Sequence, residues 1–386
     1  MAAHHLDEHI DIVAPGQLPQ LQRSYAHYTV VGSGKTGMAA WINVHDEPVH
    51  EIVWPDGADP AAVPIASVIG LPKVVAEAFV TAATPDDNID SPASWLQDGK
   101  LMVVASAKAT DMLVVYDGDT GQRLRTVGGS GKALGQLSRP NGIATIDDRF
   151  VFVVERDNRR VQMFQLPEFT PLLTFGEEAL QQPYGLWVRR IAGGYQVLVS
   201  DAYMAGEDAK GDDIVPPLAQ LDRRIRRYDV LESGGTWAAR PAGAFGDTSA
   251  AGAIRVPESL FGDEANNRLL IAEEDVPTGT RLREYDLQGR YLGRDVGEGR
   301  YVAQAEGIAL WTCGDSAGYW VTTDQGPVVN TFNLFDRQTL AHVGSLQQVV
   351  IEFPASYAIA HHLGVAGFVL GAVQQPGPEG AQRLDQ

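Results

Sequence analysis

The chain has 386 residues, 44% of them hydrophobic and 20% charged, which is enough for one large domain or two ordinary ones. Its formal charge of −19 repels phosphate backbones, so nucleic acid is excluded as an expected partner, whereas divalent cations suit such a surface. No run approaches the roughly 18 apolar residues of a membrane span, and the single cysteine, Cys313, excludes an internal disulfide.

Residues 1–73 are predicted to form an N-terminal extension of uncertain structure. The start, MAAHHLDEHIDIVAPGQ, is too acidic and polar for a signal peptide. From Tyr28, YTVVGSGKTGMAAWINVH has the pattern of a strand, a Gly-rich phosphate loop and a helix. However, a Walker loop needs glycine where this chain has Thr29, and about 45 residues before the next strand pattern cannot supply several βαβ units. We therefore predict that this stretch binds no nucleotide.

From about residue 74 the chain repeats one pattern of four short strands separated by polar turns. One copy is NGIATIDDRFVFVVERDNRRVQMFQLPEFTPLLTFG, and four others have the same order of elements. Each copy places an aromatic residue in its third strand, at Tyr116, Phe164, Tyr228, Tyr285 and Phe335. Repeated strand patterns of this kind are typical of β-propeller blades. Because helical periodicity is scarce, the sequence predicts an all-β fold.

We predict a six-bladed β-propeller over residues 74–375, followed by a disordered tail over 376–386. Five blades are visible in the repeats. The sixth is assembled from AFVTAA, beginning at Ala78, and from the C-terminal run SYAIAHHLGVAGFVLGAV. A blade that joins both ends of the chain would lock the ring, by analogy with other propellers.

The first strands of propeller blades line the central channel, so polar residues at their starts are candidates for a site. Carboxylates dominate there, and several that converge cannot all stay ionised unless cations neutralise them. The candidates are Asp90, Lys108, Glu155, Arg156, Asp157, Tyr184, Asp201, Glu258, Glu273, Glu274, Asp275, Glu306 and Asp324.

Over roughly residues 75–345 the chain resembles the β-propeller phytases, Ca²⁺-dependent phosphomonoesterases that act on inositol hexakisphosphate. DSPASW resembles the family's D-D-P-A-I-W, and KATDMLVVYDGDTGQRL resembles its K-x-G-L-x-V-Y-x-x-x-G. PESLFGDEANNRLLIAEED and AEGIAL resemble two further motifs, in the same order along the chain. The segment GQLSRPNGIA…VVERDNRRVQMF looks like a divergent bacterial branch and is also similar to NHL repeats.

The resemblance implies a Ca²⁺ site and a phosphate site in the channel. Its Ca²⁺ ligands would be Asp90, Glu258, Glu274 and Glu306, and its phosphate-binding residues would be Lys108, Arg156 and Tyr184. Catalysis would rest on Glu258, Glu274, Glu306 and Arg156, with cations and Arg156 stabilising charge on the phosphoryl group as water attacks it. The resemblance also implies a secreted or periplasmic monomer with a phosphorylated small-molecule substrate and no nucleic-acid or membrane partner.

Three positions depart from the family pattern. Gln304 stands in place of an acidic residue, Ala202 in place of a phosphate-binding lysine, and the C-terminal T-D-G-I segment is absent, with Glu352 as the only acid in its place. Two alternatives therefore stay open. One is a non-catalytic NHL-like binding propeller, and the other is a different Ca²⁺-dependent propeller hydrolase such as a lactonase.

Overall fold

The computed structural model describes residues 79–301, 304–313, 317–325 and 330–348, and the backbone of strands at 20–22, 27–33, 37–44, 47–53, 73–75, 358–363 and 366–372. Within these ranges the fold is all-β, with no α-helix and three 3₁₀-helices, at Pro85–Asp87, Leu218–Gln220 and Val276–Thr278. No helix among them is long and apolar enough to cross a membrane. The chain divides into two compact units, residues 1–75 with 344–347 and residues 76–343 with 348–386.

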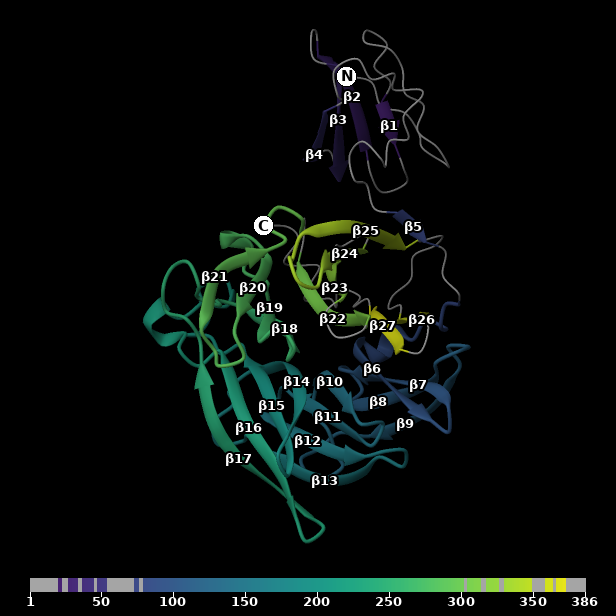
Figure 1. The fold of residues 1–386 in the computed structure, drawn as a ribbon, viewed down its shortest axis with the longest axis vertical. Helices are drawn as coiled ribbons and strands as arrows, with labels where there is room; N and C mark the ends of the chain where they lie inside the picture. The colour runs from purple at the N-terminus through teal and green to yellow at the C-terminus, as the bar shows by residue number, and fades with distance from the viewer. Residues whose placement is uncertain are drawn as a thin grey trace. The chain divides into compact units, whose positions relative to one another are not determined.

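Five antiparallel sheets follow one another in chain order around a centre and form the blades of a β-propeller, as predicted (Figure 1). In each blade the strands pair in sequence order, and the sheet of the fifth blade continues from β25 to β5 (Lys73–Val75). The blades are β6–β9 (Ile89–Gln97, Lys100–Ala107, Met112–Asp117, Arg123–Gly128), β10–β13 (Pro140–Ile146, Phe150–Glu155, Arg160–Gln165, Thr170–Phe175), β14–β17 (Pro183–Ile191, Gly194–Asp201, Ile225–Ser233, Thr236–Phe245), β18–β21 (Pro257–Asp263, Arg268–Glu273, Arg281–Tyr285, Tyr291–Val296) and β22–β25 (Ala305–Cys313, Ala317–Gln325, Asn330–Asp336, His342–Gln348).

The predicted number of six blades is wrong, because the described residues form five four-stranded blades. The C-terminal run supplies only a two-stranded sheet, β26 (Ala358–Leu363) and β27 (Ala366–Ala372). The predicted strand AFVTAA, residues 78–83, is not formed over its described residues 79–83, and Phe79 packs against the first blade instead. β27 contacts both β22 and β6, so the C-terminal hairpin lies between the fifth and first blades without completing another one.

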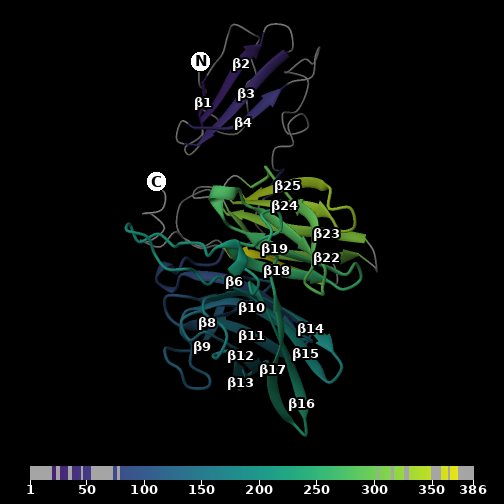
Figure 2. The same cartoon turned by 90° about the vertical axis from the view of Figure 1, so that its left-hand side faces the viewer.

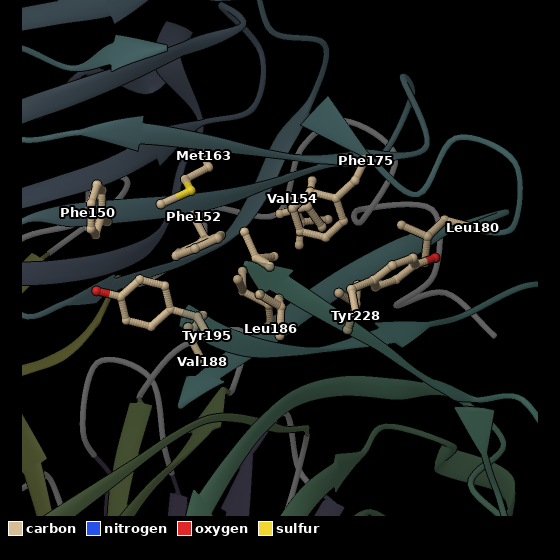
Figure 3. Packing of buried hydrophobic residues seen from close by; sticks show 14 residues of the cluster. Phe150, Phe152, Val154, Met163, Phe175, Leu180, Leu186, Val188, Tyr195 and Tyr228 are labelled. Carbon is tan, nitrogen blue, oxygen red and sulfur yellow. The ribbon is translucent and has the colours of Figure 1, made fainter. Parts of the chain in front are cut away.

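Neighbouring blades are held together by apolar side chains that interdigitate between their faces. Figure 3 shows the cluster between the second and third blades, where Phe152 and Met163 meet Leu186 and Tyr195. The predicted third-strand aromatics belong to such clusters. All five are at most 5% exposed, and Phe164 and Tyr285 are fully buried. Since each blade buries both faces against its neighbours, the repeat pattern specifies a ring.

The outer hairpin of the third blade, β16–β17, projects beyond the neighbouring blades (Figure 2). Trp237 fixes it by stacking on Tyr195 with ring centroids 5.7 Å apart and by an edge contact with Phe150 at 5.1 Å. Aromatic pairs of this geometry add about 0.5–1.5 kcal/mol each beyond the area they bury.

The N-terminal extension contains a separate antiparallel sheet with the order β1-β2-β3-β4 (Gln20–Gln22, His27–Ser33, Gly37–Val44, Glu47–Val53). The helix expected after the Gly-rich loop is therefore wrong. β2 and β3 form a hairpin in which Ser33 pairs with Gly37, and the loop residues 34–36 lie outside the described residues. A phosphate loop needs a helix N-terminus to face the anion, and a hairpin offers none. The predicted tail, 376–386, also lies outside the described residues.

A buried ion pair joins the fourth and fifth blades. Arg337 donates from Nε and Nη2 to the two carboxylate oxygens of Asp263, each at 2.7 Å, and Asn266 Nδ2 adds a hydrogen bond at 2.6 Å. Burial by itself would raise the pKa of Asp263, but the hydrogen bonds from Arg337 and Asn266 outweigh it, and the pKa lies below its ordinary value.

We expect Asp263→Asn to lower the free energy of unfolding by about 3–5 kcal/mol at pH 7, because it removes the buried carboxylate that accepts two hydrogen bonds from Arg337. The folded pKa of Asp263 is depressed, so its contribution is present above the unfolded pKa of about 3.9 and is lost as the pH falls through the folded value. Denaturant titrations from pH 7 to pH 3 should therefore show the two proteins converging in acid.

Asp222→Asn serves as the control for this prediction. Its partner is Arg223, and both side chains are more than half exposed. Removing that pair should cost less than about 1 kcal/mol. Equal losses from the two substitutions would show that the buried pair is not what joins the blades.

Candidate functional site

The innermost strand of every blade carries the same bulge near its start. In the first blade Ile89 pairs with Ala107 and the next pair is Pro92 with Ala105, so two residues of β6 oppose one of β7. The same interruption follows the first paired residue of β10, β14, β18 and β22. The first residue of each bulge is polar, and we call these five the inner ring: Asp90, Asn141, Tyr184, Glu258 and Glu306.

Small residues at the second bulge position bring successive inner strands into backbone contact. A Cβ atom added to Gly142 would lie 2.6 Å from the carbonyl oxygen of Tyr184, and one added to Gly185 would lie 2.6 Å from that of Glu258. Ser200 Oγ accepts from the Gly185 N–H and donates to the Glu258 carbonyl oxygen, both at 2.7 Å. The inner ring is therefore built on backbones that touch from blade to blade.

A second set of equivalent positions lies just after the second strand of each blade. In the first blade, Ala107 pairs with Ile89 next to the bulge, and Lys108 is the residue that follows Ala107. The backbone N–H there donates to the carbonyl two residues before the inner-ring residue, as from Lys108 to Asn88 at 3.1 Å and from Glu274 to Val256 at 3.0 Å. The same bond recurs in all five blades. We call these five positions the outer ring: Lys108, Arg156, Ala202, Glu274 and Gln325.

Three carboxyl groups interact directly where the two rings meet. Glu306 lies within hydrogen-bonding reach of both Glu258 and Glu274. Burial raises the pKa of Glu258 well above its ordinary value, and the charges of Glu306 and Glu274 raise it further. Burial likewise raises the pKa of Glu306, against the hydrogen bonds from its two neighbours. The arrangement is that of carboxyl groups which share protons because they cannot all ionise side by side.

Asp90 and Tyr184 complete this group. The charge of Glu258 is the largest cause that raises the pKa of the Tyr184 hydroxyl, followed by burial and by the charges of Asp90 and of the other two glutamates. Tyr184 therefore stays protonated and can donate a hydrogen bond. The structure thus brings together the four predicted carboxylates and Tyr184, which the sequence had spread over 216 residues.

Lys108 lies beside the same cluster. Its Nζ is 3.4 Å from Asp90 Oδ2, and the two side chains are 2% and 14% exposed. Neither atom makes a well-aligned hydrogen bond. Lys108 also lowers the pKa of Glu306, so its positive charge acts on the carboxyl cluster as well as on Asp90.

Gln304, where the phytase pattern has an acid, donates from Nε2 to Glu274 Oε1 at 2.9 Å. It therefore positions one of the clustered glutamates through a neutral contact. Ala202 is buried in the outer ring and leaves that position without a charge. The region predicted to replace the T-D-G-I segment includes residues 349–357, which lie outside the described residues.

Arg156 lies in a second pocket of about 520 Å³, with Gln182, Tyr203 and the acidic Glu207 in its wall. With the Gln182 amide oriented to satisfy both of its groups, Arg156 Nη2 donates to Gln182 Oε1 at 2.9 Å. Arg156 is therefore equivalent in the fold to Lys108, but its guanidinium lines a different pocket from the one that the clustered carboxylates line.

Three other predicted carboxylates hold the scaffold. Glu155, Asp201 and Glu273 end their second strands, are fully buried and accept backbone N–H groups from the segment that leads into the inner strand. The sequence does not separate Glu273 from Glu274 by residue type. Strand register separates them. Glu273 is the last residue of β19 that pairs with β18 and points into the blade, and Glu274 follows it and belongs to the outer ring.

A cavity of about 400 Å³ runs along the inner strands from the inner ring. Four of the five inner-ring residues line it, together with the small residues of the bulges. Further along, the wall contains the aromatic side chains of Trp187, Phe261 and Trp311. The cavity is thus acidic at one end, and its wall combines aromatic side chains with polar ones such as Thr145 and Thr323.

In the described part of the chain, no group of three or more His, Cys, Asp or Glu side chains is arranged so that it could hold a metal ion. The donor chemistry still fits a hard cation, because the cluster offers carboxylate oxygens and no sulfur or imidazole. Asp90 Oδ2 is buried and has no hydrogen-bond partner, and its ion pair with Lys108 Nζ is 3.4 Å long. A hard cation bound here would have to draw its ligands from Asp90, Glu258, Glu274 and Glu306, which interact with one another.

No protein-family model matches the chain, and no curated protein matches its sequence. Among solved structures, a gluconolactonase from Xanthomonas campestris is 14% identical over 70% of this chain and 78% of its own, with a TM-score of 0.44. A virginiamycin B lyase from Staphylococcus aureus is 12% identical over 74% and 78%, with a TM-score of 0.41.

Kuenenia stuttgartiensis hydrazine synthase is 10% identical over 68% of this chain, with a TM-score of 0.37, and the matched part is 63% of that longer relative. None of these three proteins is a phytase. Similarity at this level assigns no function to the chain, so a functional argument has to come from the site.

The adjacent residues Glu273 and Glu274 provide a test of the two carboxylate roles. Glu273→Gln removes one of two charged acceptors for the Arg255 and Val256 N–H groups, and we expect a loss of about 1–3 kcal/mol in the free energy of unfolding. Glu274→Gln keeps an acceptor for Gln304 and relieves repulsion, so we expect a change within about 0.5 kcal/mol. Urea denaturation of both variants in chelator measures this. Similar losses would contradict the assignment of separate roles.

Proposed function

We propose that the protein is a Ca²⁺-dependent phosphomonoester hydrolase that acts on phytate or a related phosphorylated small molecule in the propeller channel. The observation that supports this is the contact of Glu306 with Glu258 and Glu274, with Asp90 beside them. Buried acids that crowd without a cation hold protons that a bound cation would displace. Carboxylate oxygens at this density are what Ca²⁺ requires.

The residues beside the cluster suit an anionic substrate. Lys108 brings a buried positive charge, and the Tyr184 hydroxyl remains a donor because its pKa is raised. Both can hold a phosphate oxygen at the mouth of the cavity. When bound, Ca²⁺ would supply the positive charge that offsets the charge developing on the phosphoryl group.

Within this proposal, Asp90, Glu258, Glu274 and Glu306 bind the cation, and Lys108 and Tyr184 orient the phosphate. Preorganised donors of this kind lower the barrier because they need no rearrangement as charge develops. Arg156 was predicted to contact the same phosphate. Its place in the second pocket instead suits another phosphate of a substrate that carries several.

The aromatic wall of the cavity favours a second candidate, a Ca²⁺-dependent hydrolase of a neutral ring ester such as a lactone. Trp187, Phe261 and Trp311 offer apolar surface that a multiply charged substrate would leave unused. The third reading, a non-catalytic NHL-like binding propeller, predicted that the acidic side chains would be splayed apart, and their direct contact argues against it.

We expect the purified protein to release phosphate from phytate when Ca²⁺ is added, and to stop when the ion is removed by a chelator. Glu258→Ala should lower the rate at least about 100-fold, since it removes a central ligand. Glu298→Gln, a change at a 74% exposed carboxylate, is the matched control and should leave the rate unchanged. No turnover at saturating Ca²⁺ by correctly folded protein would refute the phosphatase proposal.

A screen of aliphatic and aromatic lactones under the same conditions separates the second candidate. If that candidate is right, hydrolysis should require Ca²⁺ and Glu258, and should fall when Trp311→Ala removes part of the aromatic wall. Lactone turnover without phosphate release would assign the site to ring-ester hydrolysis. Binding of a protein partner that persists in chelator, with neither activity, would instead favour the NHL-like reading.

A further inference from the structure

Asn141 occupies the inner-ring position of the second blade, and the sequence analysis did not single it out. It follows Pro140, the first paired residue of β10, as Glu258 follows Pro257 and Tyr184 follows Pro183. It precedes Gly142, whose backbone meets the Tyr184 carbonyl of the next blade. Four of the five equivalent positions carry clustered acids and Tyr184, and Asn141 is at the fifth.

The Asn141 amide is fully buried, yet neither Oδ1 nor Nδ2 has a hydrogen-bond partner. Burying an unpaired amide costs about 1–3 kcal/mol. Native proteins keep such groups at few positions, and each one calls for an explanation such as a bound ion, a water or a ligand.

Another buried asparagine of the same blade shows how the fold treats a structural amide. Asn158 is 6% exposed, and its Nδ2 donates to the Gly131 carbonyl at 2.8 Å and to Glu155 Oε2 at 2.5 Å. The protein therefore supplies partners for the Asn158 amide nitrogen. Asn141 receives none from the protein.

We propose that Asn141 is a further ligand of the cation site, with Oδ1 as a neutral oxygen donor beside the four carboxylates. The inference rests on the proposed function in that it takes the bound ion to be Ca²⁺. Amide oxygens are ordinary Ca²⁺ ligands, and a neutral one completes the coordination shell without another charge in a cluster that already holds four acids. Its placement also explains why the amide is left without protein partners.

The test is Ca²⁺ titration of the full chain by calorimetry, with Ca²⁺ alone as the probe. We expect Asn141→Leu, which keeps the size and removes the oxygen, to weaken Ca²⁺ affinity by about tenfold or more. Asn141→Asp restores an oxygen donor and should bind at least as tightly as the parent protein. Glu258→Gln, which changes a proposed carboxylate ligand, should also weaken binding.

Thermal unfolding in chelator separates a ligand role from a structural one. Asn141→Leu removes an unpaired buried amide, so without Ca²⁺ it should be as stable as the parent protein or more so. Asn158→Leu, the matched control, should lose stability and keep its Ca²⁺ affinity.

Two results would overturn the inference on its own. One is an unchanged Ca²⁺ affinity of Asn141→Leu while Glu258→Gln has lost binding, and the other is a loss of stability of Asn141→Leu in chelator. If the parent protein binds no Ca²⁺ at all, the proposed function falls together with this inference. Binding that depends on Glu258 and not on Asn141 leaves the proposed function standing.

Discussion

The contact between the backbones of successive inner strands is the constraint on which the rest of the structure depends. Gly142 and Gly185 have no room for a side chain, because the carbonyl of the next blade lies where a Cβ atom would be. Strands that approach this closely force the preceding side chains, one from each blade, into a common space. The crowding of Glu258, Glu306 and Tyr184 is therefore a result of how the ring closes.

That crowding has an electrostatic cost, which appears as raised pKa values of Glu258, Glu306 and Tyr184. The fold offsets it with other charged groups that are fully satisfied. Glu273 accepts two backbone N–H groups, and Asp263 makes a bidentate pair with Arg337. The pair between the fourth and fifth blades favours the charged form of Asp263, whose pKa is lowered, while the centre retains unfavourable interactions that a ligand can relieve.

The fold was largely predictable because apolar alternation and a recurring aromatic follow directly from packing between blades. The number of blades was not predictable, because a blade forms only where strands find neighbouring strands to pair with. The composition of the segment near Phe79 does not reveal whether such neighbours exist. The same limit explains the helix expected after the Gly-rich loop, because pairing with β2 makes Gly37–Val44 a strand. In the site, acidic residues were conspicuous in the sequence, but Asn141, a neutral amide between proline and glycine, has the composition of an ordinary turn.

Sequence also could not assign neighbouring acids to their roles, because Glu273 and Glu274 differ only in register. Once the register is known, every blade contributes one side chain to the outer ring from the same backbone position. The backbone N–H at that position donates to the carbonyl two residues before the inner-ring residue of the same blade. Side chains at these five positions can be exchanged while the backbone bonds beneath them persist. The neutral Ala202 and Gln325 are already two such variants, so the chemistry of this ring can differ from blade to blade on one unchanged backbone frame.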